Sequence, residues 1–146
     1  MKKSDSTLLI AVLFIAIFFF SGSSTGNFAL TQMPKGSFDW VDEHCSIVAG
    51  WTCDPSNYNE ALEVLIYDGP AKYGYIVATG IANLERENAV GEKCGGNNFH
   101  GYFIELPDSV KDGKRHDFHV YAVNIPKGPR PQLQGSPKRI TCPLME

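Results

Sequence analysis

Short runs in which apolar and β-branched residues alternate with polar ones dominate the chain from Cys45 onward. A period of two is typical of a β-strand with one buried face. The runs lie at residues 45–53, 62–67, 75–82, 100–106, 116–123, 132–134 and 139–142. Turn-forming pairs such as Asp68-Gly69 and Asp112-Gly113 separate some of them. About seven short strands divided by turns predict an all-β fold, an antiparallel Greek-key β-sandwich.

The alternation also indicates which side chains share a face. The positions grouped in this way are Leu62, Val64 and Ile66, expected to point inward, and Phe118, Val120 and Ala122. In 45–53 the odd positions, including Cys45, Trp51 and Cys53, share one face of what we expect to be the first core strand. Charged residues between 83 and 93 interrupt the pattern, so we predict an irregular connection there with room for one helical turn.

The longest apolar run has a different character. It covers Leu8–Phe20, 13 residues without a charge, and follows Lys2 and Lys3. A positive start, an apolar stretch of this length and small residues after it are typical of an export signal. A helix that spans a bilayer needs about 20 apolar residues, so cleavage is favoured and a retained signal anchor is the alternative. The predicted organisation is a signal peptide or signal anchor at 1–24, a flexible tether at 25–37 and a folded domain at 38–146.

Four cysteines, Cys45, Cys53, Cys94 and Cys142, lie beyond the export signal. An even number in a small exported domain predicts two disulfides and an oxidising compartment, at the cell surface, in a periplasm or outside the cell. We favour Cys45–Cys142 with Cys53–Cys94, because the first bridge would tie the first strand to the last; the other two pairings stay open. Zinc binding is disfavoured because the chain has no C-x-x-C pair.

Charge narrows the range of partners. The chain has 13 Lys and Arg against 16 Asp and Glu, and without Lys2, Lys3 and Asp5 the balance is 11 against 15, a net charge of −4. A nucleic-acid-binding domain normally carries a basic surplus, so nucleic acid is not an expected partner. The membrane is expected to be a partner only through the N-terminal segment, if that segment is retained.

Several blocks along the chain form a recurring pattern. In order they are Cys45-x-Ile47 with Gly50-Trp51-x-x-Asp54, then Tyr67-Asp68-Gly69, His100-Gly101-Tyr102, Asp112-Gly113 with His116, and Ser136-Pro137 before Cys142. In this order and spacing they resemble a module of exported microbial proteins, and the resemblance covers nearly all of the chain from Asp39 to Cys142. It implies an immunoglobulin-like sandwich and no general activity. The resemblance implies that the single bridge of the usual two-cysteine form of this module corresponds to Cys45 and Cys142. Cys53 and Cys94 then look like an additional pair.

The residues of these blocks fit structural roles. We assign such roles to Gly50, Trp51, Asp54, Asp68, Gly69, His100, Gly101, Asp112, Gly113 and His116. Trp51 would bury a large aromatic surface beside a disulfide, and the two histidines would make structural hydrogen bonds at the starts of strands.

Catalysis and bound metal are both disfavoured. Histidines, Asp117 and Ser46 or Ser136 can be combined into a triad on paper, but the chain has no G-x-S-x-G motif and no helices for a hydrolase scaffold. Acidic residues in turns form no calcium-loop motif. The sequence therefore predicts no enzyme, no cofactor and no metal site.

Aromatic residues near turns supply the candidate binding residues. Trp40 lies between Asp39 and Asp42, and Tyr58 lies between Asn57 and Asn59. An aromatic face beside polar groups suits a sugar ring. We therefore favour a noncatalytic binding or adhesion module with a glycan ligand, which predicts a coplanar pair of exposed aromatic rings.

Two other functions stay open. The first is a structural or protein-interaction subunit of a surface assembly, which predicts an apolar patch or an unpaired edge strand. The second is a small secreted hydrolase, which needs a cleft with a histidine, a carboxylate and a nucleophile. The oligomeric state is open in each case.

Overall fold

A computed structural model describes residues 32–126 and 128–145, so the predicted signal segment and most of the predicted tether lie outside the described residues. The described part contains eight strands, one short α-helix and one 3-10 turn. The elements are β1 (Lys35–Val41), β2 (Ile47–Cys53), β3 (Leu62–Asp68), β4 (Tyr75–Ala82), β5 (Leu84–Glu85), α1 (Asn88–Lys93), β6 (Phe99–Glu105), the 3-10 turn (Asp108–Val110), β7 (Arg115–Ala122) and β8 (Lys138–Thr141).

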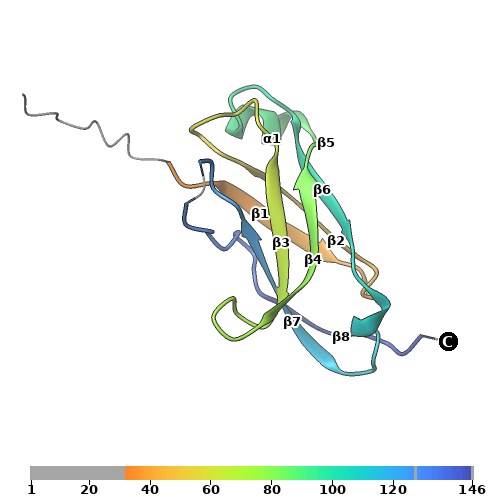
Figure 1. Cartoon of the computed structure of the whole chain (residues 1–146). Coiled ribbons are helices and arrows are strands. Elements are labelled where there is room, and N and C mark those ends of the chain that lie inside the picture. Colours follow the sequence, from red (N-terminus) through yellow and green to blue (C-terminus); the bar gives the residue numbers. More distant parts are fainter. Residues whose placement is uncertain (1–31, 127, 146) are drawn as a thin grey trace, which may run out of the picture.

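The strands form two antiparallel sheets of four strands each. One sheet has the order β1-β2-β6-β5, and the other has the order β4-β3-β7-β8. The two sheets are layered over each other, with β3 and β4 in front in Figure 1. Two facing sheets are needed because each sheet buries its apolar side chains against the other. The predicted all-β, sandwich-like architecture is therefore confirmed.

The main core lies between the sheets and follows the alternation in the sequence. The grouped side chains of β3 and β7, namely Leu62, Val64, Ile66, Phe118, Val120 and Ala122, are all fully buried. The sheet β1-β2-β6-β5 contributes Phe38, Val48, Tyr102 and Ile104 from the opposite side. The prediction of the core face is confirmed for both central strands of the sheet β4-β3-β7-β8.

The sequence predicts one core face for β2, formed by its odd positions, but both faces of this strand are buried. Val48, at an even position, belongs to the main core. Trp51 and Cys53, at odd positions, belong to a second cluster with Val90 of α1 and Cys94. The odd face of β2 therefore points away from the other sheet, and α1 covers one end of it.

Three other segments differ in part from what the local sequence pattern predicts. Strand β1 begins at Lys35, ahead of the expected domain boundary at Phe38. The stretch at 83–93, expected to be irregular with room for one helical turn, holds the six residues of α1 and also the strand β5, which was not expected. The run at 132–134 makes isolated bridges to Ser37 and Tyr121 and no strand. In each case contacts with distant segments decide the conformation, and local sequence gives little sign of them.

Gly50 lies on β2 between β1 and β6, at a position that leaves no room for a side chain. It pairs with Tyr102, whose buried hydroxyl donates a hydrogen bond of 2.9 Å to the Ser37 carbonyl oxygen. A Cβ at Gly50 would collide with both the hydroxyl and that oxygen. We expect Gly50→Ala to lower the free energy of unfolding by about 2 kcal/mol through overpacking. Tyr102→Phe should cost about 1 kcal/mol, because it removes one hydrogen bond.

Urea denaturation of both variants tests this explanation. Equal stability of Gly50→Ala and the wild type would show that the strands can separate enough to accept a methyl group, contrary to the packing described.

Candidate functional site

The disulfides join Cys45 to Cys142 and Cys53 to Cys94, as the favoured pairing predicted. Cys45 lies in the turn between β1 and β2, and Cys142 directly follows β8, so this bridge connects the two sheets. All four cysteines take part in these two disulfides, so none is left as a thiolate ligand for zinc. Two disulfides fit an oxidising environment.

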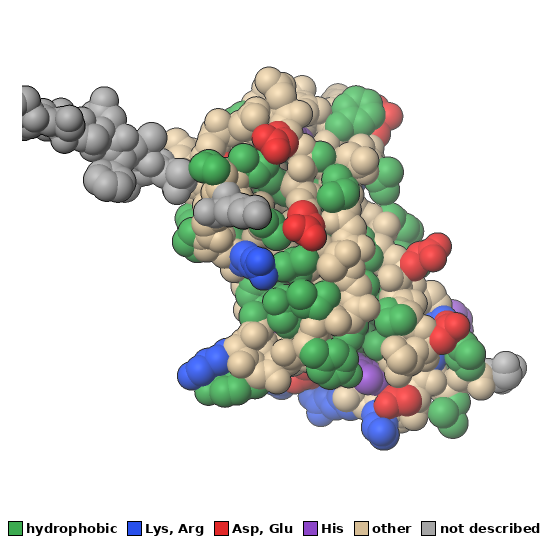
Figure 2. Space-filling view, in the orientation of Figure 1, with side chains coloured by type: hydrophobic (Ala, Val, Ile, Leu, Met, Phe, Trp, Pro, Cys, Tyr) green, Lys and Arg blue, Asp and Glu red, His purple; other side chains and the backbone are tan. Residues whose placement is uncertain are grey.

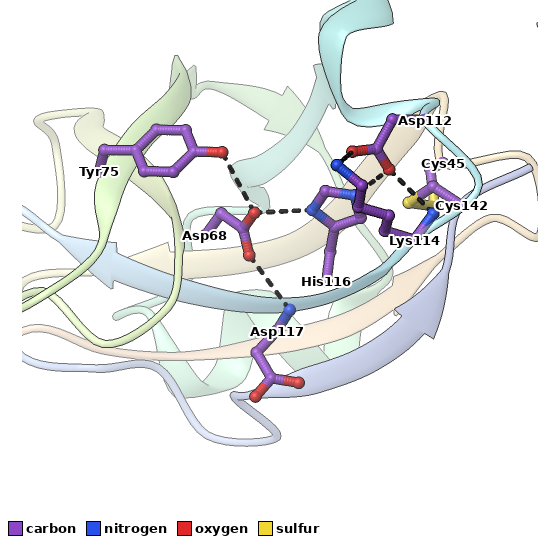
Figure 3. A network of polar contacts seen from close by, with 8 residues as sticks. All are labelled: Cys45, Asp68, Tyr75, Asp112, Lys114, His116, Asp117 and Cys142. Atoms are coloured by element: carbon purple, nitrogen blue, oxygen red, sulfur yellow. Dashed lines mark hydrogen bonds and ion pairs between the residues drawn. A yellow bond between two sulfur atoms is a disulfide. The ribbon is translucent and has the colours of Figure 1, made fainter. Parts of the chain in front are cut away.

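His116 lies between two carboxylates, as Figure 3 shows. Its Nδ1 is 2.7 Å from Asp68 Oδ2, and its Nε2 is 3.0 Å from Asp112 Oδ1. An ionised carboxylate only accepts hydrogen bonds, so the protonated ring, which donates from both nitrogens, matches both partners. Burial opposes this charge, but the hydrogen bonds to Asp68 and Asp112 outweigh it and raise the pKa of His116. The hydrogen bond from His116 is also the main cause that lowers the pKa of Asp112 to about 2.

The two carboxylates also bind backbone and neighbouring side chains. Asp68 accepts from the Asp117 amide at 3.2 Å and from the Tyr75 hydroxyl at 3.4 Å. Asp112 accepts from the Lys114 amide at 2.9 Å. The network ties the end of β3 to the start of β7 and to the turn before β7.

His100 and Asp54 are buried and bind backbone groups of the segments that follow β2 and β7. His100 Nε2 donates to the Tyr58 carbonyl oxygen at 2.9 Å, and burial is the main cause that lowers the pKa of His100. Asp54 accepts from the amides of Ser56 at 2.8 Å and Ile125 at 3.1 Å. These contacts fit structural roles, since neither side chain faces open solvent.

Tyr58 packs against the second apolar cluster, next to the Cys53–Cys94 disulfide. Its hydroxyl accepts a hydrogen bond from Lys35 Nζ at 3.1 Å. The Asn57 side chain accepts from the Asn59 amide at 3.1 Å and donates to a Glu60 carboxylate oxygen at 3.3 Å. The Asn57 side chain, one of the groups expected to bind a ligand, is therefore used within the loop itself.

Trp40 lies on the outer face of the sheet β1-β2-β6-β5, where it contacts Phe103 of β6. The ring centroids are 5.2 Å apart and the rings are nearly perpendicular, at 78°. Trp40 is 42% exposed and Phe103 is 54% exposed. Leu84 of β5 is also exposed and lines a groove of about 260 Å³ together with both rings. Large apolar side chains are usually buried, so this exposed set is a candidate binding surface.

A fixed guanidinium group lies at the same groove. Arg86 Nη1 donates to Asp39 Oδ2 at 3.0 Å, and its Nε and Nη2 donate to the two carboxylate oxygens of Glu87 at 2.8 and 3.0 Å. The hydrogen bond to Glu87 is the main cause that raises the pKa of Arg86. A Cβ at Gly101 would meet the Arg86 stem at 2.8 Å, so the absent side chain at Gly101 lets that stem lie against β6.

The structure does not bring Trp40 and Tyr58 into one site. Lys35, which contacts Tyr58, lies at the start of β1 opposite Cys53, whereas Trp40 lies near its end opposite Ala49. Five residues of extended strand separate these positions by about 16 Å. The expected coplanar pair of rings is also absent at Trp40, because its neighbour Phe103 stands edge-on.

Sequence reasoning missed Phe103, Leu84 and Arg86 as members of the candidate site. Phe103 could have been found, because it is out of phase with buried Tyr102 and Ile104 and must point outward. Leu84 and Arg86 lie in a charged stretch that shows no strand pattern. Their place beside Trp40 depends on the pairing of β5 with β6.

No protein-family model matches the chain, and no curated protein is similar enough to match it. Within residues 32–126 and 128–145, no helix has the length and apolar character to cross a membrane. Over the same residues, no group of three His, Cys, Asp or Glu side chains is placed to hold a metal ion.

Proposed function

We propose that this protein is a noncatalytic exported binding module of the immunoglobulin-like kind, with a carbohydrate ligand in the groove at Trp40. The observation that carries this proposal is the exposed Trp40–Phe103 pair beside a polar network. Export rests on the predicted N-terminal signal and on the two disulfides, which are typical of oxidising compartments.

The strand order supports the immunoglobulin-like part of the proposal. Immunoglobulin domains of the constant type have one sheet in the order A-B-E-D, and the other contains C, F and G. Lettering the strands β1 to β8 as A, B, C, C′, D, E, F and G gives A-B-E-D for one sheet and C′-C-F-G for the other. This order supports a Greek-key connectivity. The disulfides differ from the B–F bridge of antibody domains, since neither joins β2 to β7.

The chemistry of the groove supports a sugar as the ligand. A sugar ring has apolar C–H faces that pack on an aromatic ring, and hydroxyl groups that need fixed donors and acceptors at its edge. Trp40 and Phe103 offer the aromatic surface, and the Arg86–Asp39 pair offers donors and acceptors at the rim. Strands hold most of these groups, which favours a preformed site.

A protein partner is the second candidate function. Exposed Ile76 and Ile81 lie on β4, an edge strand of the other sheet. Figure 2, which looks onto that sheet, shows apolar side chains gathered over its strands with acidic residues scattered among them. An exposed apolar edge strand can pair with a strand of another chain.

The hydrolase hypothesis has less support. Both ring nitrogens of His116 are hydrogen-bonded to carboxylates, and the Ser136 hydroxyl accepts a hydrogen bond of 2.8 Å from the Val120 amide. A general base needs a ring nitrogen that can reach the nucleophile.

A glycan array tests the proposed function. We expect saturable binding by the disulfide-intact protein, weakened at least about tenfold by Trp40→Ala, because truncating a central aromatic residue typically removes a large share of binding energy. Tyr73→Ala is the matched control and should bind like the wild type, since Tyr73 is exposed outside the groove. Absence of glycan binding by the folded protein would remove carbohydrate as the ligand and favour the protein partner.

A further inference from the structure

The groove at Trp40 has more acidic than basic groups around it. Asp39, Glu85 and Arg86 line it, and Glu87 is bound to Arg86 at its edge. Three carboxylates therefore surround a single guanidinium group. The Arg86 hydrogen bond is the main cause that holds the pKa of Glu87 below its ordinary value, so this carboxylate stays ionised near neutral pH.

Arginine is the usual residue for binding acidic ligands, because its planar fork matches a carboxylate or sulfate group. At this groove the fork is already occupied. Its Nε and Nη2 bind Glu87, and its Nη1 binds Asp39. Two of the five guanidinium N–H groups bind none of the described residues, but an acidic ligand that reached them would lie beside the carboxylates of Asp39 and Glu87, which repel it.

Glu85 adds a negative charge without a compensating partner. Its side chain is exposed, and it makes no ion pair or side-chain hydrogen bond with any of the described residues. Like charges brought close together repel, and the repulsion between exposed groups weakens as salt is added. A hydroxyl group, in contrast, can accept from Arg86 and donate to a carboxylate without any change in charge.

We propose that the groove selects uncharged sugars and rejects sugars that carry carboxylate or sulfate groups, with Glu85 as a specificity-determining residue. This proposal rests on the proposed carbohydrate-binding function. Arg86 acts as a positioning residue, which holds Asp39 and Glu87 at the rim and supplies donors to hydroxyl groups.

The test uses glycans in pairs that differ in charge. Suitable pairs are fully methyl-esterified and free-acid oligogalacturonides, desulfated and sulfated galactans, and glycans before and after removal of sialic acid. For each pair that binds, we expect the uncharged member to bind the full-length, disulfide-intact protein at least about tenfold more tightly at low salt. The ratio should shrink in about 1 M NaCl, where charges are screened within about 3 Å.

Two variants locate the selectivity. Glu85→Gln should reduce the preference for the uncharged member severalfold, because it removes a repulsion that acts on the acidic member. Glu63→Gln is the matched control, because Glu63 is an exposed carboxylate on β3 in the other sheet. The ratio of the affinities for the uncharged and acidic members should be the same in this variant as in the wild type.

The possible outcomes separate this proposal from the one on which it depends. Equal or tighter binding of the acidic members, or an unchanged ratio in Glu85→Gln, would overturn the selectivity and leave carbohydrate binding in place. No binding to any glycan by protein that is folded and oxidised would overturn both proposals.

Discussion

Replacing Cys45 and Cys142 together by alanine should lower the free energy of unfolding by about 4 to 5 kcal/mol, the largest effect we expect from any side-chain change. The two cysteines are 97 residues apart, so the bridge closes a loop that includes nearly all of the described strands. A crosslink of this span strongly restricts the unfolded chain, and the loop-entropy relation gives about 4.7 kcal/mol for a loop of about 100 residues.

Urea denaturation measures this effect, with the Cys53→Ala/Cys94→Ala variant for comparison. That second bridge spans 41 residues, so its removal should cost about 1 kcal/mol less. Both pairs are fully buried, so the cavities left behind are similar and their contributions cancel in the comparison. A larger loss from the shorter loop would show that local packing around α1, and not chain closure, dominates.

His116→Ala should destabilise the protein by about 3 kcal/mol at pH 6, the second largest expected effect. The ring is 7% exposed and stacks on Phe118, with centroids 5.7 Å apart. Its removal leaves Asp68 and Asp112, which are 17% and 34% exposed, facing each other without the cation between them. Breaking a buried pair from one side typically costs about 3 to 5 kcal/mol, and solvent at these carboxylates places the expected cost at the lower end of that range. Thermal or urea denaturation of the variant tests this value.

The contribution of His116 also depends on pH. Its pKa is raised in the folded protein, so its stabilisation is complete below the unfolded value of about 6.5 and is lost as the pH rises through the folded pKa. The pKa of Asp112 is depressed, so its contribution is present above about 4 and is lost as the pH falls towards about 2. We therefore expect a fall in stability on the alkaline side that His116→Ala does not show.

An NMR titration of the histidine rings supplies an independent measurement. The reference is the pKa of about 6.5 of an unperturbed histidine. A His116 ring that loses its proton below that pH would contradict the raised pKa between Asp68 and Asp112.

The parts of the fold that depend on alternation could be predicted from the sequence. Leu62, Val64 and Ile66 repeat with a period of two beside a turn signal, and all three are fully buried. Strand β1 has no such pattern: of its residues only Phe38 is fully buried, and its pairing with β2 shifts register between Phe38 and Trp40. A strand at the sheet edge, held mainly through backbone hydrogen bonds to one neighbour, has little local signature.

The candidate groove was only partly predictable, for a topological reason. Trp40, Leu84 and Phe103 come from three strands that are distant in sequence and meet because the sheet order is β1-β2-β6-β5. Trp40 could be recognised as a candidate because an aromatic residue between acidic residues is unusual in a core. Its neighbours follow from sheet order, which the run of apolar residues does not specify.

The central claim is that a glycan binds at Trp40, and the two tryptophan side chains allow a direct test. Trp40 lies in the groove, whereas Trp51 is buried in the second cluster beside Cys53. A nitrogen–proton NMR spectrum of the labelled protein shows one indole signal from each. During titration with the uncharged glycan that binds best on the array, we expect a progressive shift of the Trp40 indole signal while the Trp51 signal stays in place. A saturable shift of the Trp51 signal, or no shift of either signal despite confirmed binding, would contradict glycan binding at Trp40.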